Sequence, residues 1–175
     1  MKTILLSLIT TAALALPATG FATTPRDHSA TATVEFLNSK DFTDFKTKLN
    51  STDADRQALE RELRKAVQRD AAASLPAGFH LTLRFRDIDL AGDFEPGRNF
   101  NYGDIRIVRD IYPPRLSVEY VVADATGNVV ASGERQLTDL AFQSRIVNPA
   151  LVSDQTYSEQ QLLADFIGEL GHHLG

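Results

Sequence analysis

The sequence predicts an α+β domain of two layers, in which two helices cover one face of a sheet of four to five strands that is mostly antiparallel or mixed. Apolar residues recur at helical spacing in two segments and alternate with polar residues in several others. The segments follow the order strand, helix, strands, helix along the 175 residues.

The first strand is expected at residues 31–36, where β-branched residues recur, and the first helix from Thr52 to about Leu75. Thr52 is a candidate cap for this helix, and Pro76 and Gly78 end it. If the helix links two parallel strands, the sheet is mixed. Its apolar positions share one face: Leu59, Leu63, Ala66, Val67 and Ala71.

The central strands are indicated by alternation from Phe79 to Phe85, which slips near Arg86 and Asp87 and so predicts a β-bulge or strand end there. Further strands are expected at residues 105–108 and 116–122. A turn at residues 124–127 places Asp first and Gly last, so it predicts a hairpin with residues 128–136.

The last helix is expected from Thr156, which has capping-box spacing to Glu159, to Gly171. An apolar stripe gives this helix one buried face, formed by Leu162, Leu163, Phe166, Ile167 and Leu170.

The amino terminus has the layout of a cleavable secretory signal over residues 1–22: Lys2, an apolar stretch from Ile4 to Leu16, and small residues at Gly20 and Ala22. The apolar stretch is shorter than the roughly 20 residues of a spanning helix. We therefore expect export to the periplasm, a flexible segment at residues 23–30, a single globular domain at residues 31–175, and no membrane span after signal removal.

Composition narrows the range of partners. The chain has a formal charge of −5 and no cysteine. An acidic protein is a poor partner for nucleic acid or anionic lipid, because both require a basic surface. Without cysteine, neither disulfides nor a lipidated cysteine is available.

The candidate binding residues lie in and after an acidic segment at residues 87–95. This segment has four carboxylates within nine residues, and arginines follow it. The segment resembles part of a calcium-binding loop, but Ala91 and Arg98 stand where ligands belong. The competing interpretation is a solvated strand end whose acids pair with Arg84, Arg86, Arg98, Arg106 or Arg109. The binding candidates are Asp87, Asp89, Asp93, Glu95, Arg98, Arg106 and Arg109.

Histidines offer a second candidate metal site. His172 and His173 follow the expected last helix, and His80 or His28 could join one of them. Adjacent histidines point about 100° apart on a helix, so a pair at a frayed helix end is the favoured interpretation.

Familiar catalytic signatures are absent from the sequence, including the serine-hydrolase elbow, the zinc-protease helix motif, the P-loop and the dinucleotide fingerprint. We therefore predict no catalytic residues and no cofactor. A carboxylate pair for hydrolysis has no fixed spacing in sequence, and that alternative stays open.

Four blocks of the sequence together resemble the family called domain of unknown function 3016. They are VEFLNSKDFTDF from Val34, DIDLAGDFEPGR from Asp87, DIRIVRDIYPPRLSVEY from Asp104 and ERQLTDLAF from Glu134. The resemblance implies a bacterial envelope protein and implies no activity.

These observations favour a non-catalytic binding or adaptor domain of the periplasm, whose partner is another envelope protein. The alternatives are a carboxylate- or metal-dependent hydrolase of the envelope that uses Asp87, Asp89, Asp93 or Glu95, and a purely structural role.

Overall fold

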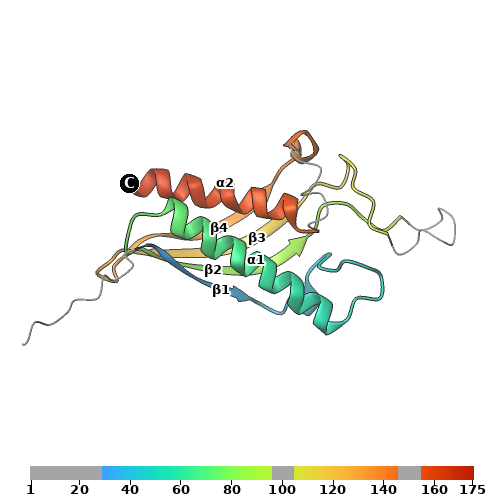
Figure 1. Ribbon diagram of the computed structural model, residues 1–175, viewed down its shortest axis with the longest axis horizontal. Coiled ribbons are helices and arrows are strands. Elements are labelled where there is room, and N and C mark those ends of the chain that lie inside the picture. Colours follow the sequence, from blue (N-terminus) through green and yellow to red (C-terminus); the bar gives the residue numbers. More distant parts are fainter. Residues whose placement is uncertain (1–28, 96–104, 146–154) are drawn as a thin grey trace, which may run out of the picture.

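The computed structural model describes residues 29–95, 105–145 and 155–175 (Figure 1). The expected signal, Arg98 and His28 lie outside these ranges. The elements are β1 (Thr31–Phe36), η1 (Ser39–Asp41), α1 (Asp53–Ser74), β2 (His80–Asp89), β3 (Arg115–Ala123), β4 (Val129–Thr138), η2 (Phe142–Arg145) and α2 (Tyr157–Leu174).

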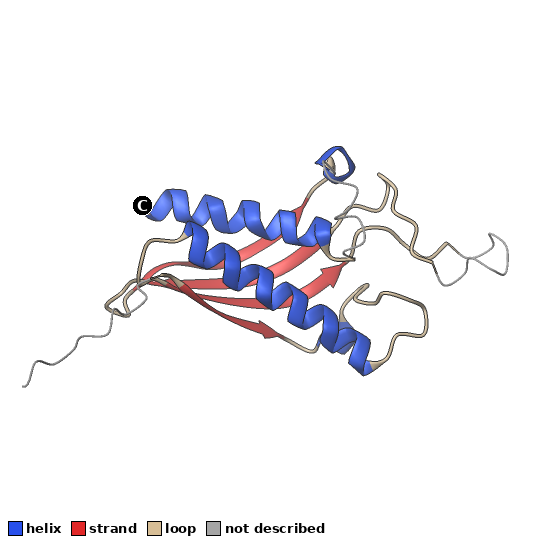
Figure 2. Ribbon diagram, in the orientation of Figure 1, coloured by secondary structure: helices blue, strands red, loops and turns tan. Residues whose placement is uncertain are grey.

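The four strands form one sheet in the order β1-β2-β3-β4. β1 is parallel to β2, and the other neighbours are antiparallel, so the sheet is mixed. Both helices lie on the same face of the sheet (Figure 2), with α1 against β1 and α2 toward β4. The predicted α+β class and the order strand, helix, strands, helix are confirmed.

The strand expected at residues 105–108 is wrong. In the structure Ile107 makes only an isolated bridge to Asp93. The strands β2 and β3 are each paired on both sides, so among the described residues the sheet offers free edges only on β1 and β4. Residues 105–108 contact the loop that follows β2, through the bridge of Ile107 to Asp93, and they add no strand at either free edge.

The hydrophobic core lies between the sheet and the two helices. Leu81, Leu83 and Phe85 of β2 are fully buried beneath the helices. A shift in register between Phe85 and Asp87 restores the phase, so that Ile88 is again buried. The predicted bulge is confirmed, and its consequence is that β2 keeps one apolar face along its whole length.

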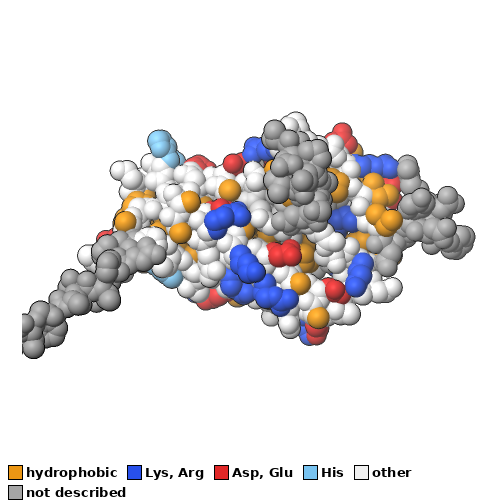
Figure 3. Space-filling model, in the orientation of Figure 1, with side chains coloured by type: hydrophobic (Ala, Val, Ile, Leu, Met, Phe, Trp, Pro, Cys, Tyr) orange, Lys and Arg blue, Asp and Glu red, His pale blue; other side chains and the backbone are white. Residues whose placement is uncertain are grey.

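The helix α1 begins at a capping box. The Thr52 hydroxyl accepts a hydrogen bond from Asp55 N–H, and the Asp55 carboxylate accepts one from Thr52 N–H. The bond from the Thr52 backbone is the main cause that lowers the pKa of Asp55. Outside the core face, Lys and Arg side chains gather along α1 (Figure 3). The cap predicted at Thr52 is confirmed.

Two expectations for α2 are wrong. The helix does not end at Gly171 but continues through Leu174. Gly171 lies where α2 closely approaches α1, and a Cβ at this position would collide with the backbone carbonyl of Ser74. Thr156 makes no side-chain cap: its hydroxyl accepts a hydrogen bond from the Gln160 side chain, and the fully buried Glu159 carboxylate bonds to the backbone of Ala91. Among the described residues, no helix is both long enough and apolar enough to cross a membrane.

Candidate functional site

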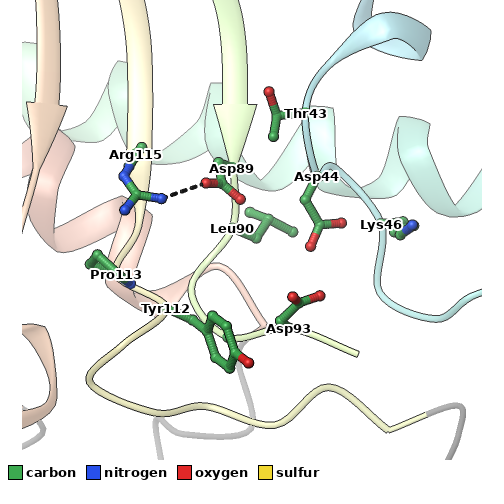
Figure 4. A pocket seen from close by; sticks show the side chains of 10 residues that line it. Thr43, Asp44, Lys46, Asp89, Leu90, Asp93, Tyr112, Pro113 and Arg115 are labelled. Carbon is green, nitrogen blue, oxygen red and sulfur yellow. Dashed lines mark hydrogen bonds and ion pairs between the residues drawn. The ribbon is translucent and has the colours of Figure 1, made fainter. Parts of the chain in front are cut away.

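A cavity of about 320 Å³ lies at the end of the sheet where β2 finishes and β3 begins (Figure 4). Three separate stretches of chain enclose it: the loop after β1, the end of β2 with the loop behind it, and the segment that leads into β3. Its lining residues are Thr43, Asp44, Lys46, Asp89, Leu90, Gly92, Asp93, Tyr112, Pro113 and Arg115.

Backbone hydrogen bonds hold these stretches together. Asp44 N–H donates to the carbonyl of Ile88 at 3.0 Å, and Leu90 N–H donates to the carbonyl of Asp44 at 3.0 Å. On the other side of the cavity, Gly92 N–H donates to the Tyr112 carbonyl at 3.0 Å. The walls of the cavity are thus extensions of the β-pairing beyond the regular strands.

The side chain of Arg106 connects two of the walls. Its guanidinium donates to the Asp44 carboxylate at 2.7 Å, to the Lys46 carbonyl at 2.8 Å and to the Gly92 carbonyl at 2.7 Å. It also lies over the ring of Phe94, 4.7 Å from the centroid. Arg106 was predicted as a binding residue, and in the structure its two terminal nitrogens hold the loops, while its Nε is buried without a hydrogen-bond partner among the described residues.

Asp44 is the carboxylate that sequence reasoning missed. Burial is the largest effect on its pKa and raises it, while the hydrogen bond and charge of Arg106 act in the opposite direction. Its second oxygen, Oδ1, is buried and has no hydrogen-bond partner among the described residues. Asp44 lies in the block VEFLNSKDFTDF that carries the family resemblance, but nothing in that block indicates its ion pair, because its partner Arg106 is 62 positions away.

The predicted acidic residues are distributed around the cavity and do not converge. Asp87 accepts hydrogen bonds from the backbone and hydroxyl of Thr43, both at 2.7 Å, and Asp89 pairs with Arg115 at 3.0 Å. Of the acids, Asp89 and Asp93 line the cavity. Within the described ranges, no three Asp, Glu, His or Cys side chains are placed to hold a metal ion.

The expectation that arginines pair with the acidic segment holds for one predicted pair, Arg109 with Glu95 at 3.1 Å. The others have different partners: Arg84 pairs with Glu35, and Arg86 pairs with Glu119. Arg98 lies outside the described residues.

Glu159 is a second residue whose role differs from the expected one: the sequence predicts a capping box with Thr156. Its Oε1 accepts a hydrogen bond from Ala91 N–H at 2.7 Å, which connects α2 to the loop behind the cavity. The sequence did contain a signal for this placement. Position 159 lies three and four residues before Leu162 and Leu163, on the buried stripe of the helix.

The histidines do not form a common site in the described part of the chain. His80 lies between the hydroxyls of Thr31 and Thr33, at 2.8 and 3.0 Å. His172 and His173 are exposed in the last turn of α2, at the opposite end of the sheet from the cavity.

Lys46 and Asp93 are the charged cavity residues that remain outside ion pairs. Neither has an ion-pair partner among the described residues, whereas Asp44 pairs with Arg106 and Asp89 with Arg115. Figure 4 shows the carboxylates of Asp93 and Asp44 pointing toward one another across the space. The cavity therefore presents one carboxylate and one ammonium that are outside ion pairs, and the charge of the Lys46 ammonium also acts to lower the pKa of Asp44.

The fold and the site define a small α+β domain with a polar cavity at one end of its sheet. The chain belongs to the family described as protein of unknown function (DUF3016), which matches residues 30–169. The family resemblance seen in the sequence is thereby confirmed.

Two solved structures are similar to the chain at low identity. A PelC dodecamer from Paraburkholderia phytofirmans is 15% identical with a TM-score of 0.38, and the match covers 83% of this chain and 86% of that one. A minor lipoprotein from Acinetobacter baumannii is 12% identical with a TM-score of 0.29, and the match covers 84% and 90%. No curated protein matches the sequence.

Proposed function

We propose that the chain is a non-catalytic binding domain of the cell envelope, exported by a signal at residues 1–22, and that the cavity is its binding site. One observation carries the proposal: three stretches of chain distant in sequence enclose an open space and are held in place by contacts that leave it unfilled. Preformed concavities of about 300 Å³ or more are typical of ligand sites, and a few polar groups placed in them orient the ligand.

The ion pairs made by the carboxylates of the cavity favour a binding function over a catalytic one. Asp44 is occupied by Arg106, and Asp89 is occupied by Arg115. Carboxylates held in this way fix the shape of the walls and are poorly placed to exchange protons with a substrate. What remains available at the cavity are groups suited to recognition.

A carboxylate-dependent hydrolase is the second candidate, and a specific observation favours it. The pKa of Asp44 is raised by burial, and Asp93 faces it across the cavity. Two carboxyl groups that face each other in different surroundings are a common arrangement for a general acid and a general base. The same experiment separates the two functions.

The test compares the wild-type protein, tagged at its carboxyl terminus and expressed from the full-length sequence, with two tryptophan variants. Thr43→Trp places a large side chain at an exposed lining position of the cavity, and Gln68→Trp places the same side chain on the exposed face of α1. After incubation with envelope extract, native mass spectrometry measures the bound mass. We expect the wild type and Gln68→Trp to retain the same occupant and Thr43→Trp to lose it.

Retention of the occupant by Thr43→Trp would exclude the cavity as the binding site. Consumption of an extract component, with loss of that turnover in Asp44→Asn, would establish the hydrolase instead.

A further inference from the structure

Two ion pairs neutralise four of the charged groups around the cavity and leave one positive and one negative group outside ion pairs. Arg106 and Asp44 neutralise each other at 2.7 Å, and Arg115 and Asp89 do so at 3.0 Å. The cavity therefore presents a separated positive and negative charge, from Lys46 and Asp93, instead of a field of one sign. A ligand of single charge would satisfy one of these groups and leave the other without a partner.

Asp93 is held firmly. Its backbone pairs with Ile107 in both directions, at 3.0 and 2.8 Å, and its Oδ1 accepts a hydrogen bond from Phe94 N–H at 2.6 Å. The side chain is exposed at the cavity, so its carboxylate can receive further hydrogen bonds from a ligand. A carboxylate fixed by its own backbone loses little conformational freedom when it binds.

Lys46 is held by its backbone and by a ring. Its carbonyl accepts a hydrogen bond from Arg106, and its ammonium lies 5.7 Å from the centroid of the buried Phe94 ring. Phe94 directly follows Asp93 in the chain, and the contact with its ring limits where the Lys46 ammonium can lie. The carboxylate and the ammonium are therefore both held before a ligand binds.

We propose, on the basis of the binding function proposed above, that the cavity binds a zwitterion whose ammonium contacts Asp93 and whose carboxylate contacts Lys46. A volume of about 320 Å³ accommodates a ligand of the size of an ω-amino acid or the end of a short peptide. Hydrogen bonds between ionised groups are the strong ones, and here both are made by one ligand. The same chemistry is offered by a free amino acid and by a peptide with free ends.

Three matched probes test the charge requirement: 5-aminopentanoate, pentylamine and pentanoate, each titrated into ¹⁵N-labelled protein and followed by NMR. We expect 5-aminopentanoate to shift the amide signals of residues 43–46 and 89–93 and to bind about tenfold more tightly than either singly charged probe. Trialanine with free ends and trialanine with blocked ends form a second arm. Tighter binding of the free-ended peptide than of 5-aminopentanoate assigns the ligand to a peptide end.

Variants assign the two contacts. Asp93→Asn should reduce the affinity for 5-aminopentanoate to that for pentanoate, and Lys46→Met should reduce it to that for pentylamine. The matched controls are Asp110→Asn, on the same loop and outside the lining, and Lys48→Met, whose ammonium pairs with Asp55 at 3.3 Å. Both controls should bind like the wild type.

Equal affinity for the three probes, no measurable zwitterion binding, or insensitivity to Asp93→Asn and Lys46→Met would overturn the zwitterion inference. The cavity would still be the binding site if Thr43→Trp abolished retention of the envelope occupant. Failure of both experiments would remove the proposed function as well.

Discussion

The two ends of the sheet are built in different ways. At one end the β3–β4 hairpin is closed by contacts within five consecutive residues: the Asp124 carboxylate accepts hydrogen bonds from Thr126 N–H at 2.8 Å and from Asn128 N–H at 3.0 Å. At the cavity end, Arg106 contacts Asp44 across 62 positions, and Glu159 contacts Ala91 across 68.

This difference separates the local part of the structure from the part that depends on the complete fold. The hairpin satisfies its polar groups from its own turn, and the Thr126 hydroxyl and the Asn128 backbone lower the pKa of Asp124. The cavity walls exist only after the loops, the sheet and α2 have come together. Variants at the cavity end should therefore cost more stability than variants in the turn.

The largest effect is expected for Arg106→Leu. Removal of the guanidinium leaves the buried Asp44 carboxylate without its counter-ion, and a broken buried pair typically costs about 3–5 kcal/mol. Urea denaturation measures the loss. The control Arg109→Leu removes a more exposed pair with Glu95 and should cost at most about 1 kcal/mol. Equal losses in the two variants would show that Arg106 does not hold the cavity together.

The next largest effect is expected for Gly171→Ala, at the hairpin end of α2. Its new methyl group collides with the Ser74 backbone, so α1 and α2 must separate, at a cost of about 1–3 kcal/mol. Thermal and urea unfolding measure this cost. Gly168→Ala is the matched control: it meets no atom within 4 Å and should stabilise the same helix by about 0.4–1 kcal/mol. A stabilised Gly171→Ala would contradict the close helix contact.

A smaller effect is expected from Asp44→Asn, and it depends on pH. Burial raises the pKa of Asp44 above its ordinary 3.8, so the folded state binds this proton more tightly than the unfolded state does. The stability of the wild type relative to Asp44→Asn should therefore fall as the pH rises from about 3.8 through the raised pKa, and then level off.

Urea unfolding of both proteins between pH 3 and pH 7 measures that difference. A wild type that gains stability relative to Asp44→Asn with rising pH would mean that the Arg106 charge outweighs burial.

The smallest effect is expected for Gly127→Ala in the hairpin turn. Gly127 has a φ of +88° and no neighbouring atom within 4 Å, so the cost is that of the left-handed backbone alone, about 1 kcal/mol. Gly127→Asn should cost less, because Asn adopts this conformation more readily. Hydrogen exchange should change in residues 123–129 and remain unchanged around the cavity. Faster exchange at residues 43–46 would show that the two ends are coupled.

The fold was largely predictable from the sequence, and the reasons are local. The period of apolar residues placed α1 and β2, the Asp and Gly of the turn placed the hairpin, and the slip after Phe85 placed the bulge. The strand expected at residues 105–108 failed for a non-local reason. An alternating segment becomes a strand only where it pairs along a free edge, and residues 105–108 bridge to Asp93 beyond β2 instead of pairing with the free edges of β1 or β4.

The candidate site was predictable only in part. Asp89 and Asp93 were identified as a cluster of acids, and they do line the cavity. Arg106 was identified for its charge, but its role in holding the loops follows from hydrogen bonds to Asp44, Lys46 and Gly92 on other segments. Asp44 and Lys46 lie in a loop with no recognisable motif.

The sequence by itself thus determined the two long helices, the strands β1 to β4 and their order, because helical and strand periods and turn chemistry act between residues close along the chain. Only the tertiary structure decided which charges are neutralised and which face the cavity. That outcome depends on pairings such as Arg106 with Asp44 and Glu159 with Ala91. The partners are far apart in the sequence, so no local pattern indicates these pairings, and burial strengthens their electrostatic interactions.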